Sequence, residues 1–168
     1  MRSMKELLAH VPQKGRLAWI GLRPGRDEAM QSVQEAELES GRGLVGDRYR
    51  RKGGKRQVSL IQREHFPVVA SFLGVHEVTP EQVRRNLVVE GVNVKALQFV
   101  RFRIGDVLLE GAGACAPCSK MERADRLGVG GYAALRGMGG IIARVIAGGR
   151  IHVGDVVEVR AADNPVEV

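Results

Sequence analysis

The stretch R-F-R-I-G-D-V-L-L-E at residues 101–110 is the clearest indication of the fold. Its two short apolar runs flank a Gly-Asp pair at 105–106, which is the pattern of a β-hairpin with a tight turn. Residues 150–159 read R-I-H-V-G-D-V-V-E-V and repeat this arrangement around the Gly-Asp pair at 154–155. We therefore predict two β-hairpins in the second half of the chain.

The rest of the chain also favours short strands over long helices. Apolar or β-rich runs predict strands over residues 16–22, 30–38, 57–61, 87–89 and 141–147. Helices are predicted over 63–73, from the start signature Thr79-Pro80-Glu81-Gln82 onward, over 119–127 and over 131–136. We expect a glycine-rich loop over 42–56 and a frayed tail from Ala161. The sum predicts a mainly β fold with short helices, built as a closed or partly closed β-barrel rather than a doubly wound parallel sheet.

Composition indicates a globular protein of one domain. The 168 residues are 44% hydrophobic and 27% charged, which excludes a fibrous or disordered chain and predicts a single domain over 1–168. No run approaches the roughly 18 apolar residues of a membrane span, and the N-terminus lacks the pattern of a signal peptide. We therefore expect a cytoplasmic protein that does not enter a membrane and whose cysteines stay reduced as thiols.

Positive charge is concentrated in the glycine-rich loop. Lys and Arg exceed Asp and Glu by seven (26 − 19 = 7), and residues 42–56 alone carry seven basic residues against Asp47. Six of the seven surplus charges therefore lie in this loop, which predicts a local anionic partner such as a phosphate group held by glycine N–H groups. Only Tyr49 interrupts the charges, so the loop lacks an aromatic stacking platform and we do not expect nucleic acid as the partner. The competing interpretation is a solvated loop without a ligand.

Cys115 and Cys118 form the motif C-A-P-C, which allows several chemistries. A zinc site would need two further ligands, and no pair of histidines has the required spacing. A thioredoxin-like redox pair would have to open a helix in an α/β unit, whereas this motif follows a predicted hairpin. A single reactive thiolate is favoured if a helix beginning near Cys118 directs backbone N–H groups at its sulfur. The alternative to all three is a pair of small buried hydrophobic residues.

Arg84, Arg85 and Asn86 lie at the predicted junction of a helix and a strand. Guanidinium and amide groups at this place can bind an oxyanion or the edge of a heterocycle bidentately. The simpler interpretation is an exposed helix end, whose basic residues complement the helix dipole. Both interpretations stay open on the residues alone.

Taken in order, seven motifs resemble the MOSC family, the molybdenum cofactor sulfurase C-terminal domain. They are G-L-V-G-D-R-Y at 43–49, Q-V-S-L-I at 57–61, R-R-N-L-V-V at 84–89, R-I-G-D-V-L-L-E at 103–110, C-A-P-C-S-K-M at 115–121, G-M-G-G-I-I-A-R-V at 137–145 and G-R-I-H-V-G-D-V-V at 149–157. The resemblance spans about residues 15–160 and rests on the order and spacing of the motifs, since none of them is specific alone. It is closest in type to the compact stand-alone bacterial members, and it implies a barrel-like fold of short strands.

The resemblance also implies roles for single residues. Cys118 corresponds to the cysteine that carries sulfur or ligates molybdenum, and Cys115 to a more variable position. Arg84 and Asn86 correspond to the family's R-x-N segment, which lies against the cofactor. Relatives that hold the cofactor often carry Arg where this chain has Pro117, so one potential contact is missing here. The candidate cofactor-binding residues are Arg84, Asn86 and Cys115 from the resemblance and Arg48 and Arg56 from the charge of the 42–56 loop, with Cys118 as the catalytic residue and metal ligand.

Two functions compete under this resemblance. In the first, an oxidoreductase binds molybdenum cofactor and reduces N-hydroxylated small molecules by two electrons. An external reductase would supply these electrons, because the chain has no flavin or iron–sulfur motif. In the second, Cys118 carries persulfide sulfur from a pyridoxal-phosphate-dependent cysteine desulfurase. Pyridoxal phosphate enters through the parent sulfurase family, and no lysine site indicates direct binding. A nucleic-acid-binding module is the third alternative, and no feature indicates an oligomeric state.

Overall fold

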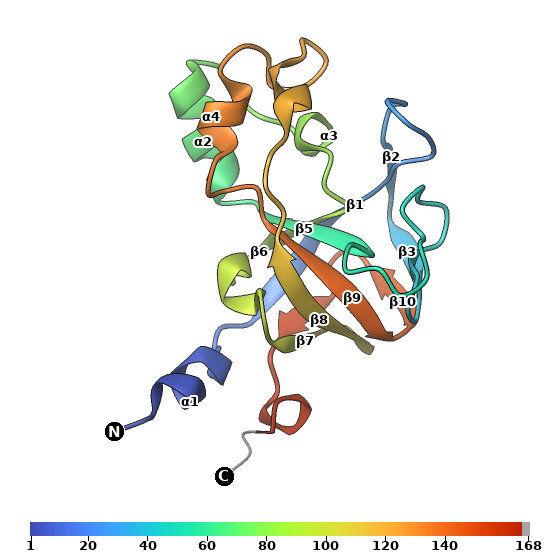
Figure 1. The fold of residues 1–168 in the computed structure, drawn as a ribbon, viewed down its shortest axis with the longest axis vertical. Helices are drawn as coiled ribbons and strands as arrows, with labels where there is room; N and C mark the ends of the chain where they lie inside the picture. The colour runs from blue at the N-terminus through green and yellow to red at the C-terminus, as the bar shows by residue number, and fades with distance from the viewer. Residues whose placement is uncertain (166–168) are drawn as a thin grey trace.

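The computed structural model describes residues 1–165 and shows a closed β-barrel (Figure 1). The barrel strands are β1 (Gly15–Leu22), β5 (Val58–Gln62), β6 (Leu87–Glu90), β7 (Arg101–Ile104), β8 (Val107–Ala114), β9 (Ile141–Ala147) and β11 (Val156–Glu158). They pair in the order β11-β7-β8-β9-β5-β6-β1, and β11 also pairs with β1, which closes the ring within the described residues. The predicted mainly β fold is confirmed, and the barrel takes its closed form.

A smaller sheet contributes to the same core. It contains β3 (Glu35–Glu39), β4 (Gly43–Leu44) and β10 (Gly149–His152) in the order β10-β3-β4, while β2 (Gln31–Val33) extends the barrel sheet beyond β1. Leu38 and Ile151 of the smaller sheet are buried in the barrel's apolar cluster. The predicted strand over 30–38 is therefore divided between two sheets, because β2 pairs with β1 whereas β3 pairs with β10.

The two predicted hairpins have different outcomes. The first is confirmed, since β7 and β8 pair on either side of a turn at 105–106. The second, over 150–159, is wrong, because β10 pairs with β3 whereas β11 pairs with β7 and β1. After the turn, the N–H of Gly154 donates to the carbonyl of Leu17 at 2.7 Å, and the N–H of Leu17 donates to the carbonyl of Asp155 at 2.8 Å. These bonds direct the chain from the smaller sheet onto β1.

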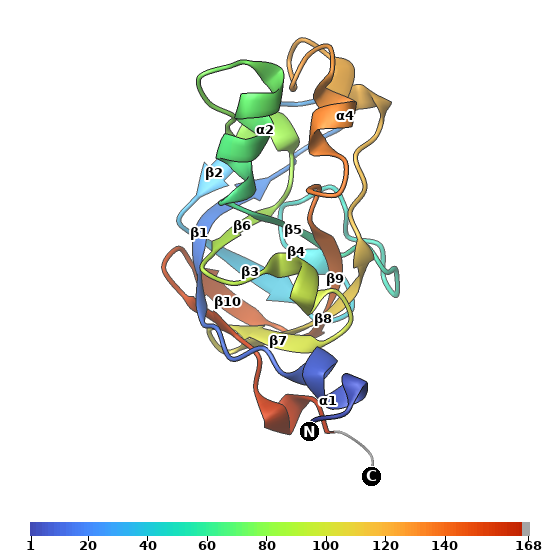
Figure 2. The ribbon, with the colours of Figure 1, turned by 90° about the vertical axis from the view of Figure 1, so that its left-hand side faces the viewer.

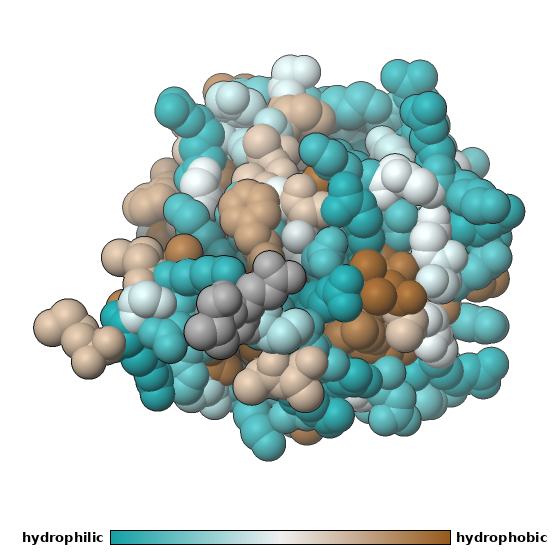
Figure 3. Space-filling view, turned by 60° about the horizontal axis from the view of Figure 1, so that its bottom comes forward, coloured by the Kyte–Doolittle hydropathy of each residue, from teal (hydrophilic) through white to brown (hydrophobic). Residues whose placement is uncertain are grey.

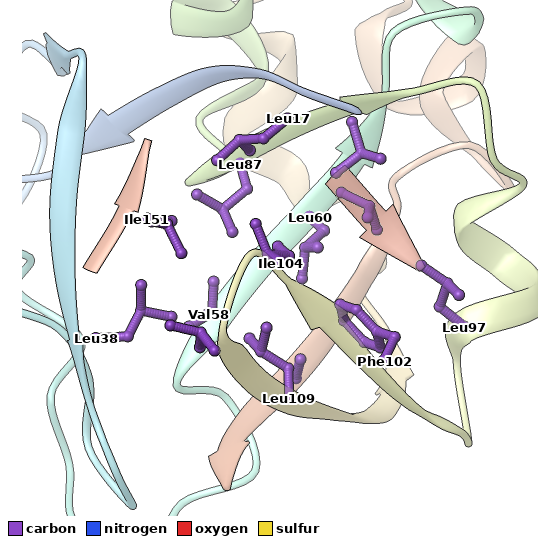
Figure 4. Packing of buried hydrophobic residues seen from close by; sticks show 14 of the residues in the cluster. Leu17, Leu38, Val58, Leu60, Leu87, Leu97, Phe102, Ile104, Leu109 and Ile151 are labelled. Atoms are coloured by element: carbon purple, nitrogen blue, oxygen red, sulfur yellow. The ribbon is translucent and has the colours of Figure 1, made fainter. Parts of the chain in front are cut away.

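β5 and β6 are buried on both of their faces. Leu60 and Leu87 lie in the barrel core (Figure 4), whereas Ile61 and Val88 belong to a second apolar cluster beneath the helices. This division follows from the alternation of side chains along a strand. β5 and β6 are parallel, and parallel strands are usually covered on both faces. The helical layer is therefore packed directly on the two strands whose ends carry the buried polar residues described below.

Short helices surround the barrel, with α2, α3 and α4 above it and α1 below it in Figures 1 and 2. They are α1 (Met4–Ala9), α2 (His65–Leu73), α3 (Pro80–Val83), α4 (Gly131–Leu135) and the 3-10 turns η1 (Val94–Leu97), η2 (Ser119–Glu122) and η3 (Ala161–Asp163). α2 ends at Gly74 in the left-handed conformation, and α3 begins with the predicted capping box between Thr79 and Gln82. Figure 3 looks toward the α1 end, where apolar side chains lie exposed between hydrophilic ones. No helix among residues 1–165 is long and apolar enough to cross a membrane.

The predicted helix over 119–127 is wrong, because only the four residues of η2 form a helical turn. Glu122 accepts hydrogen bonds from the backbone N–H groups of Gly130 at 2.9 Å and Tyr132 at 2.8 Å. The carboxylate therefore binds the first turn of α4 rather than the next turn of its own segment. This tertiary contact outweighs the helical preference of the local sequence.

The described part of the C-terminal tail is held against β7. The Asn164 side chain accepts the N–H of Arg101 and donates to its carbonyl, both at 2.8 Å, and Asp163 pairs with Arg103 at 2.7 Å. The expected fraying from Ala161 is therefore wrong for residues 161–165, and residues 166–168 lie outside the described part of the chain.

Candidate functional site

The site is built on a buried ion pair between Arg23 and Asp47. Arg23 directly follows β1, and Asp47 lies after β4 in the glycine-rich segment of residues 42–56, which we call the basic loop. The Asp47 carboxylate accepts hydrogen bonds from Arg23 Nη2 at 3.0 Å, from its Nε at 3.1 Å and from its backbone N–H at 2.7 Å. The Asp47 side chain has 0% exposure, and it also accepts the N–H of Tyr49 at 3.0 Å. The ion pair thereby attaches the basic loop to the end of β1.

Asn86 joins this ion pair to β5 and β6 and is fully buried. Its Oδ1 accepts hydrogen bonds from Arg23 Nη2 at 2.9 Å and from the N–H and hydroxyl of Ser59 at 3.1 and 3.0 Å. Its Nδ2 donates to the Asp47 carboxylate at 3.0 Å and to the carbonyl of Gly21 at 3.1 Å. Both donors of the amide are used, so Asn86 positions the ion pair. Its contact with a cofactor stays a prediction.

Basic side chains gather around a small pocket next to the ion pair. We call it the cationic pocket, and it is lined by Arg23, Asp27, Arg48, Tyr49, Arg56, Arg84, Arg85, Cys118, Lys120, Met121 and Arg126. Among these lining residues, seven carry a positive charge and Asp27 alone carries a negative one. The volume of the pocket is about 100 Å³. The excess of positive charge favours an anionic ligand.

The structure brings four of the six predicted site residues to this pocket, namely Arg48, Arg56, Arg84 and Cys118. Three segments that are distant in sequence supply them: the basic loop, the C-terminal end of α3 and the start of η2. Asn86 lies beneath the pocket, and the sixth residue, Cys115, does not line it.

The two cysteines of C-A-P-C have different surroundings. Cys118 is exposed, whereas Cys115 is 2% exposed and lines a separate cavity of about 290 Å³. The carbonyl of Cys115 accepts a hydrogen bond from Arg85 Nη2 at 3.0 Å. Among residues 1–165, no group of three or more His, Cys, Asp and Glu side chains is placed to hold a metal ion. One thiol, that of Cys118, therefore faces the cationic pocket.

Three guanidinium groups surround the ring of Tyr49. The Cζ atoms of Arg23, Arg48 and Arg56 lie 4.6, 4.8 and 5.0 Å from the centre of the ring. These distances are in the range of cation–π attraction. The ring therefore holds like charges close together on one wall of the pocket.

Arg84 and Arg85 contribute to the pocket in different ways. Partial burial lowers the pKa of Arg84 below its ordinary value, and the positive charges of Arg126 and Arg23 lower it further. Burial is also the main cause that lowers the pKa of Arg85, whose guanidinium donates to the carbonyls of Val83, Cys115 and Gly139 at 2.9, 3.0 and 2.8 Å. Arg85 thus fixes the segment that leads to Cys118, while Arg84 is a cation surrounded by cations.

Several pocket residues were missed by the sequence analysis. Arg23, Asp27, Lys120 and Arg126 lie in segments whose charges nearly balance, so composition gives no signal for them. Position offers a weak signal, because Arg23 ends a strand at the R-P-G turn and Lys120 follows Cys118 by two residues. Part of the basic loop points elsewhere, since two of its arginines, Arg42 and Arg50, pair with Glu39.

Comparison with known proteins agrees with this architecture. The model of the MOSC domain matches residues 47–158, and no curated protein sequence matches. The YUAD protein from Bacillus subtilis has a similar structure, with 17% identity, a TM-score of 0.74 and coverage of 88% of this chain and 97% of that one. YiiM from Escherichia coli follows with 22% identity, a TM-score of 0.62 and coverage of 86% and 69%. YiiM from Geobacillus stearothermophilus has 17% identity, a TM-score of 0.70 and coverage of 90% and 78%. The solved structures show a shared fold, and because the family match spans more than half of the sequence, this chain belongs to the MOSC domain family.

Proposed function

We propose that the cationic pocket binds molybdenum cofactor, an anionic pterin compound, with the Cys118 thiolate as the protein's metal ligand. The observation that carries this proposal is the convergence of seven basic side chains around one exposed thiol. A thiolate is a soft ligand that suits molybdenum. The pocket offers one thiol, that of Cys118, and residues 1–165 contain no cluster of other metal-ligating side chains. This donor set fits a metal that arrives with the sulfur atoms of its own pterin.

The electrostatics of Arg84 support an anionic ligand. Its lowered pKa reflects partial burial and repulsion from Arg126 and Arg23, which the nearby Asp27 offsets only in part. A phosphate placed among these side chains would relieve the repulsion and accept charge-assisted hydrogen bonds. Arg48 and Arg56, held against Tyr49, would contact the same anionic end.

The chemistry proposed for this site is the two-electron reduction of N-hydroxylated compounds. Conversion of an N–OH group to N–H consumes two electrons and two protons and releases water. The bound cofactor would supply the redox chemistry, and a separate reductase would supply the electrons. The protein's own residues bind the cofactor's anionic end, hold Cys118 at the edge of the pocket and, through the Arg23–Asp47–Asn86 cluster, keep the arginines in place.

Metal and pterin content test this proposal directly. The protein is purified from cells that make molybdenum cofactor, and both components are measured for the native protein, Cys118→Ala and Cys115→Ala. We expect near-stoichiometric molybdenum in the native protein and in Cys115→Ala, whose altered side chain lines another cavity. Cys118→Ala should lose the metal. Equal molybdenum in all three proteins, or none in any, contradicts the proposal.

The exposure of Cys118 also supports a second candidate function, that of a sulfur carrier. The Cys118 thiolate would attack the terminal sulfur of a persulfide on a cysteine desulfurase. The S–S bond of that persulfide breaks, its sulfur moves to Cys118, and the desulfurase cysteine leaves as a thiolate. Pyridoxal phosphate would belong to the desulfurase. Absence of molybdenum together with a persulfide on Cys118, seen by mass spectrometry after incubation with a desulfurase and cysteine, favours this function over the first.

A further inference from the structure

One carboxylate interrupts the positive wall of the cationic pocket. Within the described residues, Asp27 is the one acidic residue that lines it. Its carboxylate lies 3.2 Å from Lys120, 3.3 Å from Arg123 and 3.7 Å from Arg126. The hydrogen bond from Lys120, followed by the charges of the same three residues, lowers the pKa of Asp27. The Asp27 carboxylate therefore binds Lys120 and Arg126, two of the pocket cations that an anionic ligand would contact.

Asp27 and Arg84 share an uncommon left-handed backbone conformation. In residues 1–165, the non-glycine residues with positive φ are Asp27 at 60° and Arg84 at 54°. Most L-residues avoid this region because of steric crowding, which is a cost at Arg84, whereas Asp tolerates it. The two residues are also in contact through their neighbours, since Arg84 Nη1 donates to the carbonyl of Glu28. Strain of this kind occurs in ligand clamps and switch segments, and here it lies at Arg84, which is bonded to the loop that carries Asp27.

The size of the pocket also argues for movement. Its volume of about 100 Å³ is smaller than the roughly 300–1,000 Å³ of pockets that hold a drug-sized ligand. A phosphate-sized anion fits this space, whereas a pterin compound requires a wider opening. The loop between β1 and β2, which carries Asp27 and Glu28, forms one side of the pocket and can provide that opening.

We propose that Asp27 is an internal counter-ion that closes the cationic pocket, and that an anionic ligand displaces it and opens the loop of residues 24–30. This inference rests on the proposed function, because the ligand that displaces Asp27 is taken to be the anionic cofactor. A phosphate or diphosphate group carries more charge than the Asp27 carboxylate and offers more acceptor oxygens to Lys120 and Arg126. The pairs of Asp27 with Lys120 and Arg123 are partly exposed and therefore weak enough to be exchanged.

Binding of inorganic pyrophosphate to the cofactor-free protein tests this proposal. Titration calorimetry at low ionic strength compares the native protein, Asp27→Asn and the matched control Asp125→Asn. Asp125 pairs with Arg123 and Arg126, as Asp27 does, but does not line the pocket. We expect Asp27→Asn to bind pyrophosphate about three- to tenfold more tightly, the effect of removing weak competing ion pairs. Asp125→Asn should stay within about twofold of the native affinity.

The single tryptophan reports on the loop in the same experiment. A side chain added at Gly21 would lie 2.0 Å from the Trp19 ring and 2.8 Å from the Met30 methyl group, so the ring and the methyl group meet over Gly21. Movement of the loop that ends at Met30 should change Trp19 fluorescence as pyrophosphate saturates the native protein.

Three outcomes overturn the inference: unchanged or weaker pyrophosphate binding in Asp27→Asn, an equal gain in Asp125→Asn, or saturation without a change in Trp19 fluorescence. The two proposals fail separately. If Asp27→Asn does not tighten binding but Cys118-dependent molybdenum is found, the internal counter-ion is wrong and the cofactor proposal stands. If pyrophosphate binds Asp27→Asn more tightly as expected but no molybdenum is found in any preparation, the counter-ion role of Asp27 is kept and the pocket's ligand is an anion other than molybdenum cofactor.

Discussion

β1, β5 and β6 serve two regions with opposite chemistry. Inside the barrel their side chains are apolar and fully buried, as at Leu17, Leu60 and Leu87. Next to the cationic pocket, the same three strands position Arg23, Ser59 and Asn86, whose polar groups are satisfied by one another and by Asp47. Beyond this buried cluster lie cations that repel one another in the free protein. Packing in the barrel therefore stabilises the fold, whereas charge repulsion in the pocket destabilises it. The buried cluster couples the two regions.

Asp47→Asn should produce the largest effect, because Asp47 belongs to the buried cluster that joins the two regions. The substitution leaves the Arg23 guanidinium buried without its charge partner. Breaking a buried pair in this way lowers the free energy of unfolding by about 3–5 kcal/mol. Urea denaturation measures this loss, and pyrophosphate titration of the folded fraction should show weaker binding, since the basic loop loses its attachment to β1.

Asp125→Asn provides the control for this change, because the Asp125 carboxylate is about half exposed and its partners Arg123 and Arg126 also pair with Asp27. Its free energy of unfolding should change by less than about 1 kcal/mol. An equally small loss in Asp47→Asn would show that the buried cluster does not couple the two regions.

Leu60→Ala separates the regions by acting on the barrel alone. Leu60 has 0% exposure and lies in the barrel core. The loss of buried methyl groups and the cavity left behind should lower the free energy of unfolding by about 2–5 kcal/mol. In the protein that remains folded, pyrophosphate affinity should stay within about twofold of the native value, because no pocket contact is removed. A larger loss of affinity would mean that the pocket depends on core packing beyond the buried cluster.

Arg84→Gly separates the barrel from the cationic pocket by acting on the pocket alone. Arg84 has φ of 54°, a conformation that glycine adopts without crowding, and neighbouring cations repel its charge. We expect the free energy of unfolding to stay unchanged or to rise by up to about 1 kcal/mol. Pyrophosphate binding should weaken by about three- to tenfold, because one charge-assisted contact is lost.

Arg136→Gly is the matched control, since Arg136 is an exposed cation outside the cationic pocket. Its pyrophosphate affinity at physiological salt should change by less than about twofold because of screening. Equal loss of affinity in both variants would mean that overall charge, rather than the pocket, attracts the anion.

The same two regions differ in how far the sequence predicts them. The barrel could be predicted because alternating and apolar runs, which indicate strands, are local properties of the sequence. The turn at 105–106 formed as expected. The similar pattern at 150–159 failed, since a Gly-Asp pair specifies a turn but not which strands become neighbours. The charge of the basic loop indicated the pocket through Arg48 and Arg56. Arg23 and Arg126 could not be found in this way, because they reach the pocket through tertiary structure from segments of balanced charge.

The smallest expected effect concerns Glu122, which holds the segment after Cys118 against α4. Hydrogen bonds from the N–H groups of Gly130 and, secondly, Tyr132 lower the pKa of Glu122 below its ordinary value of 4.5. A lowered pKa in the folded state means that the stabilisation is fully present above the unfolded value and is lost as pH falls through the folded one. Glu122→Gln should therefore be less stable than the native protein at neutral pH, and the difference in urea midpoint should shrink below about pH 4.5. Glu77→Gln, which changes an exposed residue between α2 and α3, should show no such convergence. If the difference for Glu122→Gln is the same at every pH, the contact acts through packing rather than charge. The contact between η2 and α4 would then resemble the apolar packing of the barrel rather than the electrostatics of the pocket.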